Sequence, residues 1–324
     1  MKNNLLITGG AGFIGSNFIN MLNHINTLEL NSVINIDKLT YAANLNNIKI
    51  NNNINYTFYQ VDICDTAAVS EILKRHNINY IVNFAAETHV DNSILNPNVF
   101  IESNVLGTAN LLTCAKNYWQ NDYENKRFIQ ISTDEVYGSL SVENDLKFTE
   151  SSPLEPHSPY SASKASADLI VLSYYYTYNF PVVITRCSNN YGANQHREKL
   201  IPLTIFNALN DLPIPVYGDG MNIRDWINVR DFCNAILKVL QKGKIGEVYN
   251  VGANAEKTNI EVVNTILDYL NKPKTLIKYV KDRLGHDRRY GIDASKIINE
   301  LGWTPTISFE YGIINTIEWY KEVF

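Results

Sequence analysis

Cysteine is scarce in this 324-residue sequence, which contains only Cys64, Cys114, Cys187 and Cys233. The four lie dozens of residues apart and none forms a C-x-x-C pair, so the spacing suggests neither a zinc site nor a disulfide framework. No metal is expected. Reduced thiols are typical of a cytoplasmic protein, and we expect that location.

Basic runs and long apolar runs are also missing. The chain has 28 Lys+Arg against 33 Asp+Glu and a formal net charge of −5, which removes the electrostatic footprint of a nucleic-acid binder. No apolar stretch approaches the 18 or so residues that a membrane span needs. The sequence passes within a few residues of Met1 into a strand-like run, so we expect no signal peptide.

The remaining composition is that of a globular protein, with 45% hydrophobic and 19% charged residues. A chain of this length can build a full core and two lobes.

In the first half, short β-branched runs alternate with helix-period segments. The predicted strands are Asn4–Thr8, Val33–Asp37, Thr57–Val61, Tyr80–Phe84, Arg127–Ser132 and Val182–Thr185. The predicted helices are Phe13–His24, Ala67–His76, Asn98–Tyr118 and Tyr160–Tyr178. This alternation predicts an α/β fold of Rossmann type, a doubly wound parallel sheet formed by residues 1–190.

The pattern loosens after Asn190, where prolines become frequent. Helices are predicted at Lys199–Asn210, Val229–Gln241 and Asn259–Asn271, and strands at Pro215–Tyr217 and Glu247–Asn250. We interpret residues 191–324 as a smaller mixed α/β lobe that binds substrate. Because no linker separates the lobes, the chain is expected to cross between them.

Gly9, Gly12 and Gly15 follow the first predicted strand directly and open a helix. This context predicts a dinucleotide loop, with a tight turn, close approach of the backbone to a pyrophosphate, and a helix N-terminus facing the phosphates. Asp37 ends the second strand and favours NAD over NADP, since its carboxylate accepts a bond from a ribose 2′-hydroxyl. The cation of Lys38 beside it could tolerate a phosphate. A tight turn without a ligand is the alternative.

Tyr160 and Lys164 stand four residues apart, on one face of a helix. A phenol that acts as a base near neutral pH needs a pKa about 3 units below its usual value of ~10, worth about 4 kcal/mol. We expect the positive charges of Lys164 and an oxidised nicotinamide to supply this shift. A surface helix contact is the alternative.

Together these motifs resemble the extended short-chain dehydrogenase/reductases that act on nucleotide sugars, over almost the whole chain. That family has the pattern T-G-x-x-G-x-x-G, a mid-chain Asn (Asn104), a Ser/Thr after the fifth strand (Thr133) and Y-x-x-x-K. The candidate cofactor residues are Gly9, Gly12, Phe13, Ile14, Gly15, Asp37, Lys38, Thr40, Asp62, Ile63, Ala85, Ala86, Tyr160 and Lys164. Asp62 and Ile63 can border the adenine, although Asp62 could instead cap a helix.

The triplet Thr133-Asp134-Glu135 resembles that of the family's 4,6-dehydratases, which break a C–O bond and need an added acid and base. The resemblance and the chemistry assign the proton of the 4-hydroxyl to Tyr160 and the C5 proton to Glu135. Asp134, protonated, would donate to the departing C6 hydroxyl, and Thr133 would hydrogen-bond the C4 oxygen. Such adjacent carboxyls need environments that separate their pKa values. A solvated acidic loop is the alternative.

The same resemblance implies the substrate contacts. Glu87 and His89 would line the sugar, and Arg224 and Arg283 would clamp the diphosphate. The remaining candidates are Asn189, Lys199, Leu200, Asn259 and His286. The segment Gly192–Lys199 departs from the family pattern because both of its usual prolines are replaced.

The resemblance implies an NAD-dependent nucleoside-diphosphate-glucose 4,6-dehydratase in deoxysugar (rhamnose-type) synthesis. Thymidine and uridine rank as nearly equal bases for the substrate. A 4-epimerase on the same scaffold and a non-catalytic NAD-binding scaffold are the alternatives. The apolar faces of helices Asn98–Tyr118 and Tyr160–Tyr178 predict a homodimer, unless they are buried within one subunit.

Overall fold

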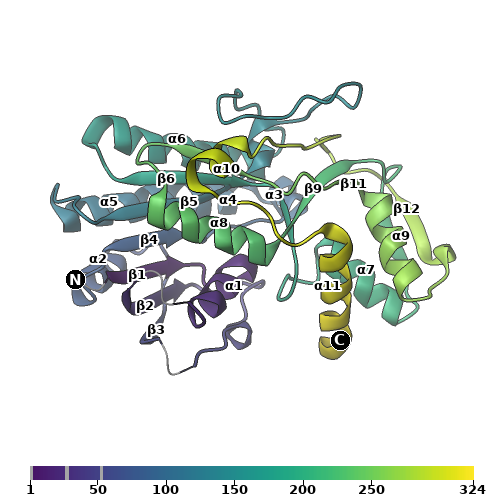
Figure 1. Cartoon of the computed structure of the whole chain (residues 1–324), viewed down its shortest axis with the longest axis horizontal. Helices are drawn as coiled ribbons and strands as arrows, with labels where there is room; N and C mark the ends of the chain where they lie inside the picture. Colours follow the sequence, from purple (N-terminus) through teal and green to yellow (C-terminus); the bar gives the residue numbers. More distant parts are fainter. Residues whose placement is uncertain (1–2, 26–28, 52–53) are drawn as a thin grey trace.

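The computed structural model describes residues 3–25, 29–51 and 54–324. A large sheet with helices on both faces fills one side of the molecule, and a smaller group of helices and short strands fills the other (Figure 1). No helix in the described ranges is long and apolar enough to cross a membrane.

All neighbouring strands of the large sheet are parallel, as the alternating pattern predicts. Their spatial order is β10-β6-β5-β4-β1-β2-β3. The strands are β1 (Asn3–Thr8), β2 (Leu30–Asp37), β3 (Tyr56–Gln60), β4 (Tyr80–Asn83), β5 (Arg127–Thr133), β6 (Val182–Cys187) and β10 (Val248–Val251). The order reverses direction beside β1, and such a switch point opens a crevice at the carboxyl ends of the strands.

Two hydrophobic clusters cover the two faces of this sheet, as alternating side chains along β1 illustrate. Leu5 and Ile7 pack on one face with the helices α1 (Phe13–Leu22), α8 (Val229–Lys242) and α10 (Ser295–Leu301). Leu6 packs on the other with α2 (Thr66–Arg75), α5 (Gly107–Trp119) and α6 (Pro159–Tyr178). Successive strand residues point to opposite faces, so each buried strand serves both clusters.

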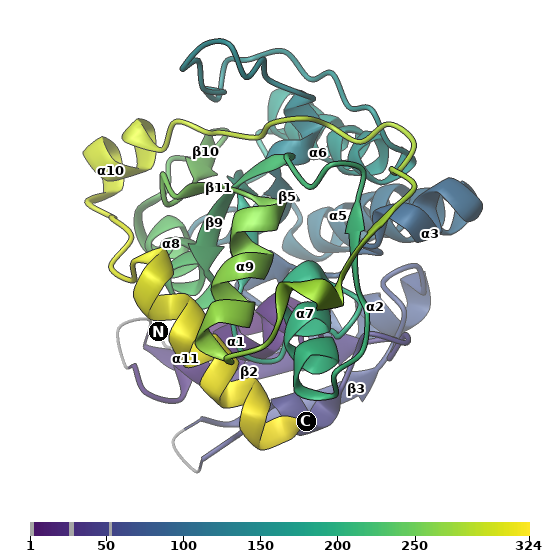
Figure 2. The same cartoon turned by 90° about the vertical axis from the view of Figure 1, so that its right-hand side faces the viewer.

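The smaller part has its own apolar cluster, around Tyr191, Trp226 and Phe309. Figure 2 shows its helices in front of the large sheet. The helices are α7 (Leu200–Leu209), α9 (Asn259–Tyr269) and α11 (Phe309–Val323). Its strands are β7 (Asn189–Tyr191), β9 (Ile223–Asn228) and β11 (Glu256–Thr258) in one sheet, and β8 (Ile214–Tyr217) and β12 (Ile277–Val280) in another. The sequence pattern did not indicate α10, α11, β7, β9, β11 or β12. Most of these elements are short, and their apolar side chains are matched to partners only in the folded structure.

The division at residue 190 does not hold for residues 229–251. Strand β10 pairs with β6 and extends the large sheet, and α8 packs on that sheet beside α1. The chain therefore crosses from the first lobe to the second and back. The short β10 run carries no sign of its partner, because strand pairing is decided by tertiary contacts.

The predicted helix Asn98–Tyr118 is broken into three pieces. They are α4 (Pro97–Phe100), a π-helical segment η2 (Ile101–Leu106) and α5. The π-helical segment carries Asn104, whose amide accepts from Glu87 N at 2.8 Å and donates to Glu87 O at 3.0 Å. A wider helical turn at a functional position is typical of π segments. A short helix α3 (Val90–Leu95), which the pattern also did not indicate, precedes α4.

Candidate active site

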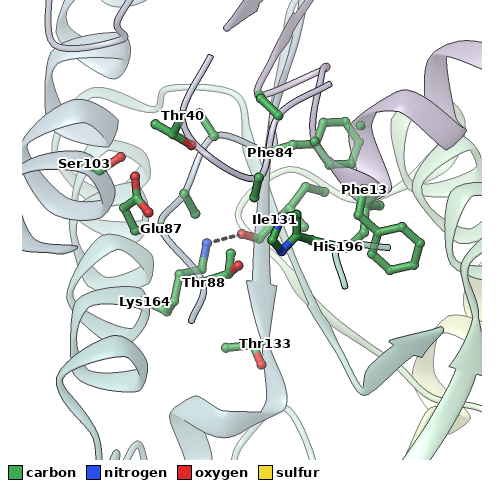
Figure 3. A pocket seen from close by; sticks show the side chains of 18 of the residues that line it. Phe13, Thr40, Phe84, Glu87, Thr88, Ser103, Ile131, Thr133, Lys164 and His196 are labelled. Atoms are coloured by element: carbon green, nitrogen blue, oxygen red, sulfur yellow. Dashed lines mark hydrogen bonds between the residues drawn. The ribbon is translucent and has the colours of Figure 1, made fainter. Parts of the chain in front are cut away.

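Two adjoining cavities lie at the carboxyl ends of the large sheet's strands. The first, here called the glycine-loop cavity, is drawn in Figure 3. The predicted residues that line it are Gly9, Gly12, Phe13, Ile14, Gly15, Asp37, Lys38, Thr40, Asp62, Ile63, Ala85, Ala86, Glu87, Thr133, Asp134, Glu135, Tyr160 and Lys164. The second, the arginine cavity, is lined by the predicted residues His89, Leu200, Arg224, Asn259, Arg283 and His286.

Three predicted residues, Glu135, Asn189 and Lys199, line both cavities. The structure thus brings every sequence-predicted residue to one continuous site. Glu87 lines the glycine-loop cavity together with Thr133 and Tyr160, and its expected place on the sugar side stays a prediction. In the described part of the chain, no group of three or more His, Cys, Asp and Glu side chains could hold a metal ion.

The glycine loop leaves no space for side chains at two of its positions. Gly9 has φ +66°, and a Cβ there would lie 2.6 Å from Ala85 N. A Cβ on Gly15 would lie 2.5 Å from Gly9 O, so helix α1 approaches the turn as closely as backbone allows. No side chain caps the start of α1 at Gly12, so the first N–H groups of the helix are available to bind an anion. This cradle fits the pyrophosphate of a dinucleotide.

Asp37 and Lys38 point to different partners. The carboxylate of Asp37 accepts from Ala11 N at 3.0 Å and Leu39 N at 2.8 Å, while burial raises its pKa. The Lys38 ammonium lies 3.7 Å from Asp62 Oδ2 and 3.9 Å from Glu87 Oε1. Its charge is therefore offset within the cavity, which argues against a Lys38 that selects a 2′-phosphate.

The carboxyl pair lies in a single 3₁₀ turn, η3 (Asp134–Tyr137), at the end of β5. Thr133 caps this turn by accepting from Glu135 N at 3.3 Å, and its hydroxyl also lies 3.4 Å from Asp134 Oδ1. Asp134 is only 1% exposed and its Oδ2 has no hydrogen-bond partner. The turn thus aims two carboxyls at different parts of the site.

The surroundings push the pKa values of these carboxyls apart, as the proposed chemistry requires. Burial, reinforced by the charges of Glu135 and Asp225, raises the pKa of Asp134 well above its usual range. Burial also raises the pKa of Glu135, but the cations of Arg224, Lys199 and Arg283 oppose that rise. Asp134 therefore holds its proton more firmly than Glu135 does.

Tyr160 and Lys164 lie on the first turns of α6. A capping box between Ser158 and Ser161 and the proline at position 159 fix the start of this helix. The Lys164 ammonium donates to Ile131 O at 2.6 Å (Figure 3), and burial lowers its pKa. Burial and the charge of Glu135 raise the pKa of Tyr160 well above its usual range.

Burial dominates the pKa of Tyr160 in the protein by itself, so the expected joint effect of Lys164 and an oxidised nicotinamide stays a prediction. Tyr160 is 8% exposed, and loss of hydration is the largest cause of its raised pKa. A bound oxidised nicotinamide would add the positive charge that favours the phenolate.

Arg224 and Arg283 are held rigidly in the arginine cavity. Arg224 Nη2 donates to Asp287 O at 2.9 Å, and its guanidinium lies 4.1 Å from the centre of the Tyr290 ring. Arg283 forms a bidentate pair with Asp91, at 2.6 and 2.9 Å. The fork of Arg283 is thus oriented by a carboxylate from the other lobe, a partner that the sequence pattern did not indicate.

The polar groups beside the arginines are also oriented by hydrogen bonds. His286 Nδ1 lies 2.7 Å from Asp282 Oδ1, and burial lowers the pKa of His286. Lys199 Nζ donates to Thr88 O at 3.0 Å. Sequence reasoning missed Asp91, Thr88, Tyr217, Asp287 and Tyr290, which line the arginine cavity. The only sequence signal for such partners is the presence of acidic and aromatic residues near Arg283.

The segment Gly192–Lys199, which lacks two prolines usual in the family, is held by side chains instead. Asn17 Nδ2 donates to Ala193 O at 2.9 Å, and Tyr41 OH donates to Glu198 Oε1 at 3.0 Å. Tyr320 OH donates to Gln195 O at 2.6 Å. These bonds hold the segment beside both cavities, and Gln195 and Lys199 line each of them.

Comparison with known proteins gives consistent matches over nearly the whole chain. Residues 6–316 match the family described as GDP-mannose 4,6 dehydratase. The chain is 50% identical to dTDP-glucose 4,6-dehydratase of Haemophilus influenzae, over 98% of this chain and 97% of that protein.

Solved structures extend the likeness to the fold. A dTDP-glucose 4,6-dehydratase from Streptomyces venezuelae with NAD bound has a TM-score of 0.92 and 45% identity, covering 98% of this chain and 97% of that one. A UDP-glucose 4-epimerase from Thermus thermophilus in complex with NAD has a TM-score of 0.88 and 27% identity, covering 99% of this chain and all of that one.

Replacing Asp134 by Asn should stabilise the protein at neutral pH. A carboxyl whose pKa is higher in the folded chain than in the unfolded chain favours folding at low pH. That contribution is lost as the pH rises above the unfolded pKa of ~3.9, because the unfolded state then releases a proton that the folded state keeps. We expect Asp134→Asn to raise the free energy of unfolding by about 1–3 kcal/mol at pH 7, and by much less at pH 4. Denaturant unfolding at both pH values measures this. The exposed Asp145→Asn is the control, and a gain that does not grow with pH would contradict the assignment.

Proposed function

The chain belongs to this GDP-mannose 4,6 dehydratase family, and we propose that it is an NAD-dependent hydro-lyase that converts dTDP-glucose to the 4-keto-6-deoxy-glucose nucleotide and water. The proposal includes a role in deoxysugar synthesis of the rhamnose type and a location in the cytoplasm. The four free cysteines agree with a reducing compartment.

One observation carries the proposal: two adjacent carboxyls, Asp134 and Glu135, with pKa values pushed apart between the glycine loop and the cationic pocket. A 4-epimerase takes a hydride from C4 and returns it there, which needs a hydroxyl and a tyrosine but no added acid and base. A non-catalytic scaffold needs none of these groups. The dehydratase is the reaction that uses both carboxyls.

The glycine-loop cavity would hold the cofactor, with Gly9, Gly12 and Gly15 at the pyrophosphate and Asp37 at the ribose. NAD supplies, when bound, a hydride acceptor and donor and a positive ring that favours the Tyr160 phenolate. Tyr160 takes the proton of the 4-hydroxyl as C4 is oxidised. Thr133 donates a hydrogen bond to the C4 oxygen and stabilises the charge that develops on it.

The elimination is then the work of the carboxyl pair. The C4 ketone acidifies the hydrogen on C5, and Glu135 removes that proton; burial raises the pKa of Glu135, and the cations of Arg224, Lys199 and Arg283 oppose that rise. Asp134, whose pKa burial raises well above its usual range, donates a proton to the C6 hydroxyl, and the C6–O bond breaks to release water. Glu135 returns its proton to C5 as C6 receives the hydride. The proton gained by Tyr160 balances the one lost by Asp134.

The base and diphosphate would lie in the arginine cavity. Arg224 and Arg283 offer oriented guanidinium groups to the phosphate oxygens, with Lys199 adding charge. Leu200 would pack beside the base. The sequence ranks thymidine and uridine as nearly equal, and the likeness to dTDP-glucose 4,6-dehydratases at about 50% identity supports thymidine. One base methyl is worth only ~1–3 kcal/mol, so UDP-glucose is retained as a weaker substrate to test.

We also propose a homodimer formed through the helices α5 and α6 and the segment that precedes them. Large apolar side chains on one side of this region are exposed, namely Leu95 (82%), Ile101 (48%), Leu106 (57%), Leu169 (58%) and Tyr176 (76%). Helix α6 contacts both α3 and η2, so the elements that carry these side chains are neighbours. Exposed apolar side chains gathered on neighbouring elements are typical of subunit interfaces.

The purified protein should convert dTDP-glucose to a product lighter by one water. With deuterium on C4 of the glucose, the label should appear on C6 of the released nucleotide sugar, because the same hydride leaves and returns. Mass spectrometry and NMR measure both, with UDP-glucose assayed in parallel. A product of unchanged mass would indicate an epimerase, and no turnover of either nucleotide sugar would indicate a scaffold.

Glu135→Gln should block the loss of water and leave C4 oxidation measurable. The amide cannot accept the C5 proton, so dehydration should fall by at least about 100-fold. Exchange of hydrogen between the cofactor and C4 should continue slowly. The exposed Glu143→Gln in the same assay is the control. Dehydration by Glu135→Gln at the parent rate would contradict the assignment of this base.

In light scattering the protein should have about twice the 36.8 kDa mass of one chain. Leu169→Arg should lower that mass toward one chain, since it puts a charge in the proposed interface. Tyr311→Arg, at a position exposed to 63% on α11, is the matched control and should leave the mass unchanged. A parent protein with the mass of one chain would contradict the homodimer.

A further inference from the structure

An ion pair that the proposed reaction does not use lies behind the catalytic groups. Arg186 on β6 is 3% exposed and Asp168 on α6 is fully buried, with Arg186 Nε 2.9 Å from Asp168 Oδ2. Neither belongs to the described lining of the two cavities. Burying two charges is costly, and apolar residues of similar volume often stabilise a core as well. Stability alone is therefore a weak explanation for this pair.

One set of hydrogen bonds, here called the Ser132 arm, joins the ion pair to the end of β5. Ser132 Oγ donates to the same oxygen, Asp168 Oδ2, at 2.9 Å. One residue earlier, Ile131 O accepts from Lys164 Nζ at 2.6 Å. Lys164 and Asp168 are one helical turn apart on α6, so two successive residues of β5 are bonded to two successive turns of α6. Thr133 follows immediately.

A second set, here called the Tyr137 arm, joins the ion pair to Tyr137, the last residue of the turn η3 that carries the two carboxyls. Arg186 Nη1 donates to Tyr137 OH at 3.0 Å, and Tyr137 OH donates to Asn250 Oδ1 at 2.8 Å. Asn250 Nδ2 donates in turn to Phe148 O at 3.1 Å. Tyr137 is 2% exposed and its ring stacks on Phe148 at 5.0 Å between centroids. The Tyr137 hydroxyl therefore accepts from Arg186 and donates to Asn250, and the stacked ring fixes its position.

We propose that Ser132, Tyr137, Asp168, Arg186 and Asn250 form a positioning network, centred on Arg186, that fixes the carboxyl turn against the tyrosine helix. The inference rests on the proposed dehydratase function. Glu135 must reach C5 and Asp134 must reach the C6 hydroxyl while Tyr160 is at C4 of the same sugar. Displacing a catalytic group by about 1 Å can cost about 100-fold in rate, so the relative placement of η3 and α6 limits the reaction.

The two arms should affect different steps. The hydrogen bonds of Tyr137 join the turn with Asp134 and Glu135 to β6 and β10, whereas Tyr160 lies on a helix that has its own capping box. Loss of the Tyr137 hydroxyl should therefore slow the elimination more than the oxidation at C4. The Ser132 arm joins β5 to α6, so its loss should slow both steps.

Tyr137→Phe tests the inference, since it removes the hydroxyl and keeps the stacked ring. With dTDP-glucose we expect kcat to fall about tenfold while KM stays within twofold. Reduced cofactor should accumulate during turnover, seen as its near-ultraviolet absorbance, because oxidation outruns elimination. Tyr249→Phe is the matched control: Tyr249 is a buried tyrosine beside Asn250, and its hydroxyl bonds to Glu300 and Lys244, away from the site.

The outcomes separate this inference from the proposed function. If the parent protein does not dehydrate dTDP-glucose, the proposed function is contradicted, and the inference of a positioning network, which rests on it, is contradicted as well. If the parent is active and Tyr137→Phe keeps its kcat, or loses it without accumulating reduced cofactor, the network does not position the carboxyls. Ser132→Ala is a second variant should Tyr137→Phe fold poorly. It should lower kcat about tenfold without accumulation of reduced cofactor, and an unchanged kcat would overturn the role of that arm.

Discussion

The site depends on the burial of two adjacent carboxyl groups where strand β5 ends. Burial raises the pKa of Asp134 well above its usual range despite the charge of Arg224, whereas Arg224, Lys199 and Arg283 all oppose the same effect at Glu135. Because the residues are neighbours in one 3₁₀ turn, the difference between them comes from what each faces. The arginine cavity supplies those cations, so the lobe that would bind the diphosphate also opposes the rise in the pKa of Glu135, the proposed C5 base.

The crossing of the chain between lobes makes this arrangement possible. Strand β10 returns to the large sheet and brings Asn250 beside Tyr137, while β9 and the segment after β12 bring Arg224 and Arg283 to the arginine cavity. The interlobe pair between Arg283 and Asp91 fixes one wall of the substrate cavity. Two separate domains on a flexible linker would not hold these groups at hydrogen-bond distances.

The fold by itself does not distinguish the reactions of this group of proteins. A dehydratase and an epimerase superimpose on this chain with TM-scores of 0.92 and 0.88. The scaffold that holds a dinucleotide and a tyrosine is common to both, and the chemistry differs in the few side chains that face C5 and C6 of the sugar. The Thr133-Asp134-Glu135 turn is therefore more informative about function than the sheet that carries it.

The sequence determined the parallel sheet, the glycine loop, Asp37 and the carboxyl triplet, because these depend on local periodicity and on short motifs with fixed spacing. Only the tertiary structure decided that β10 joins the large sheet, that a π-helical segment interrupts a predicted helix, and that Arg283 pairs with Asp91. It also placed Tyr160 in a buried position beside Glu135, where burial and that charge raise its pKa. Pairing partners, burial and pKa direction depend on residues far apart in the chain, which a local pattern does not contain.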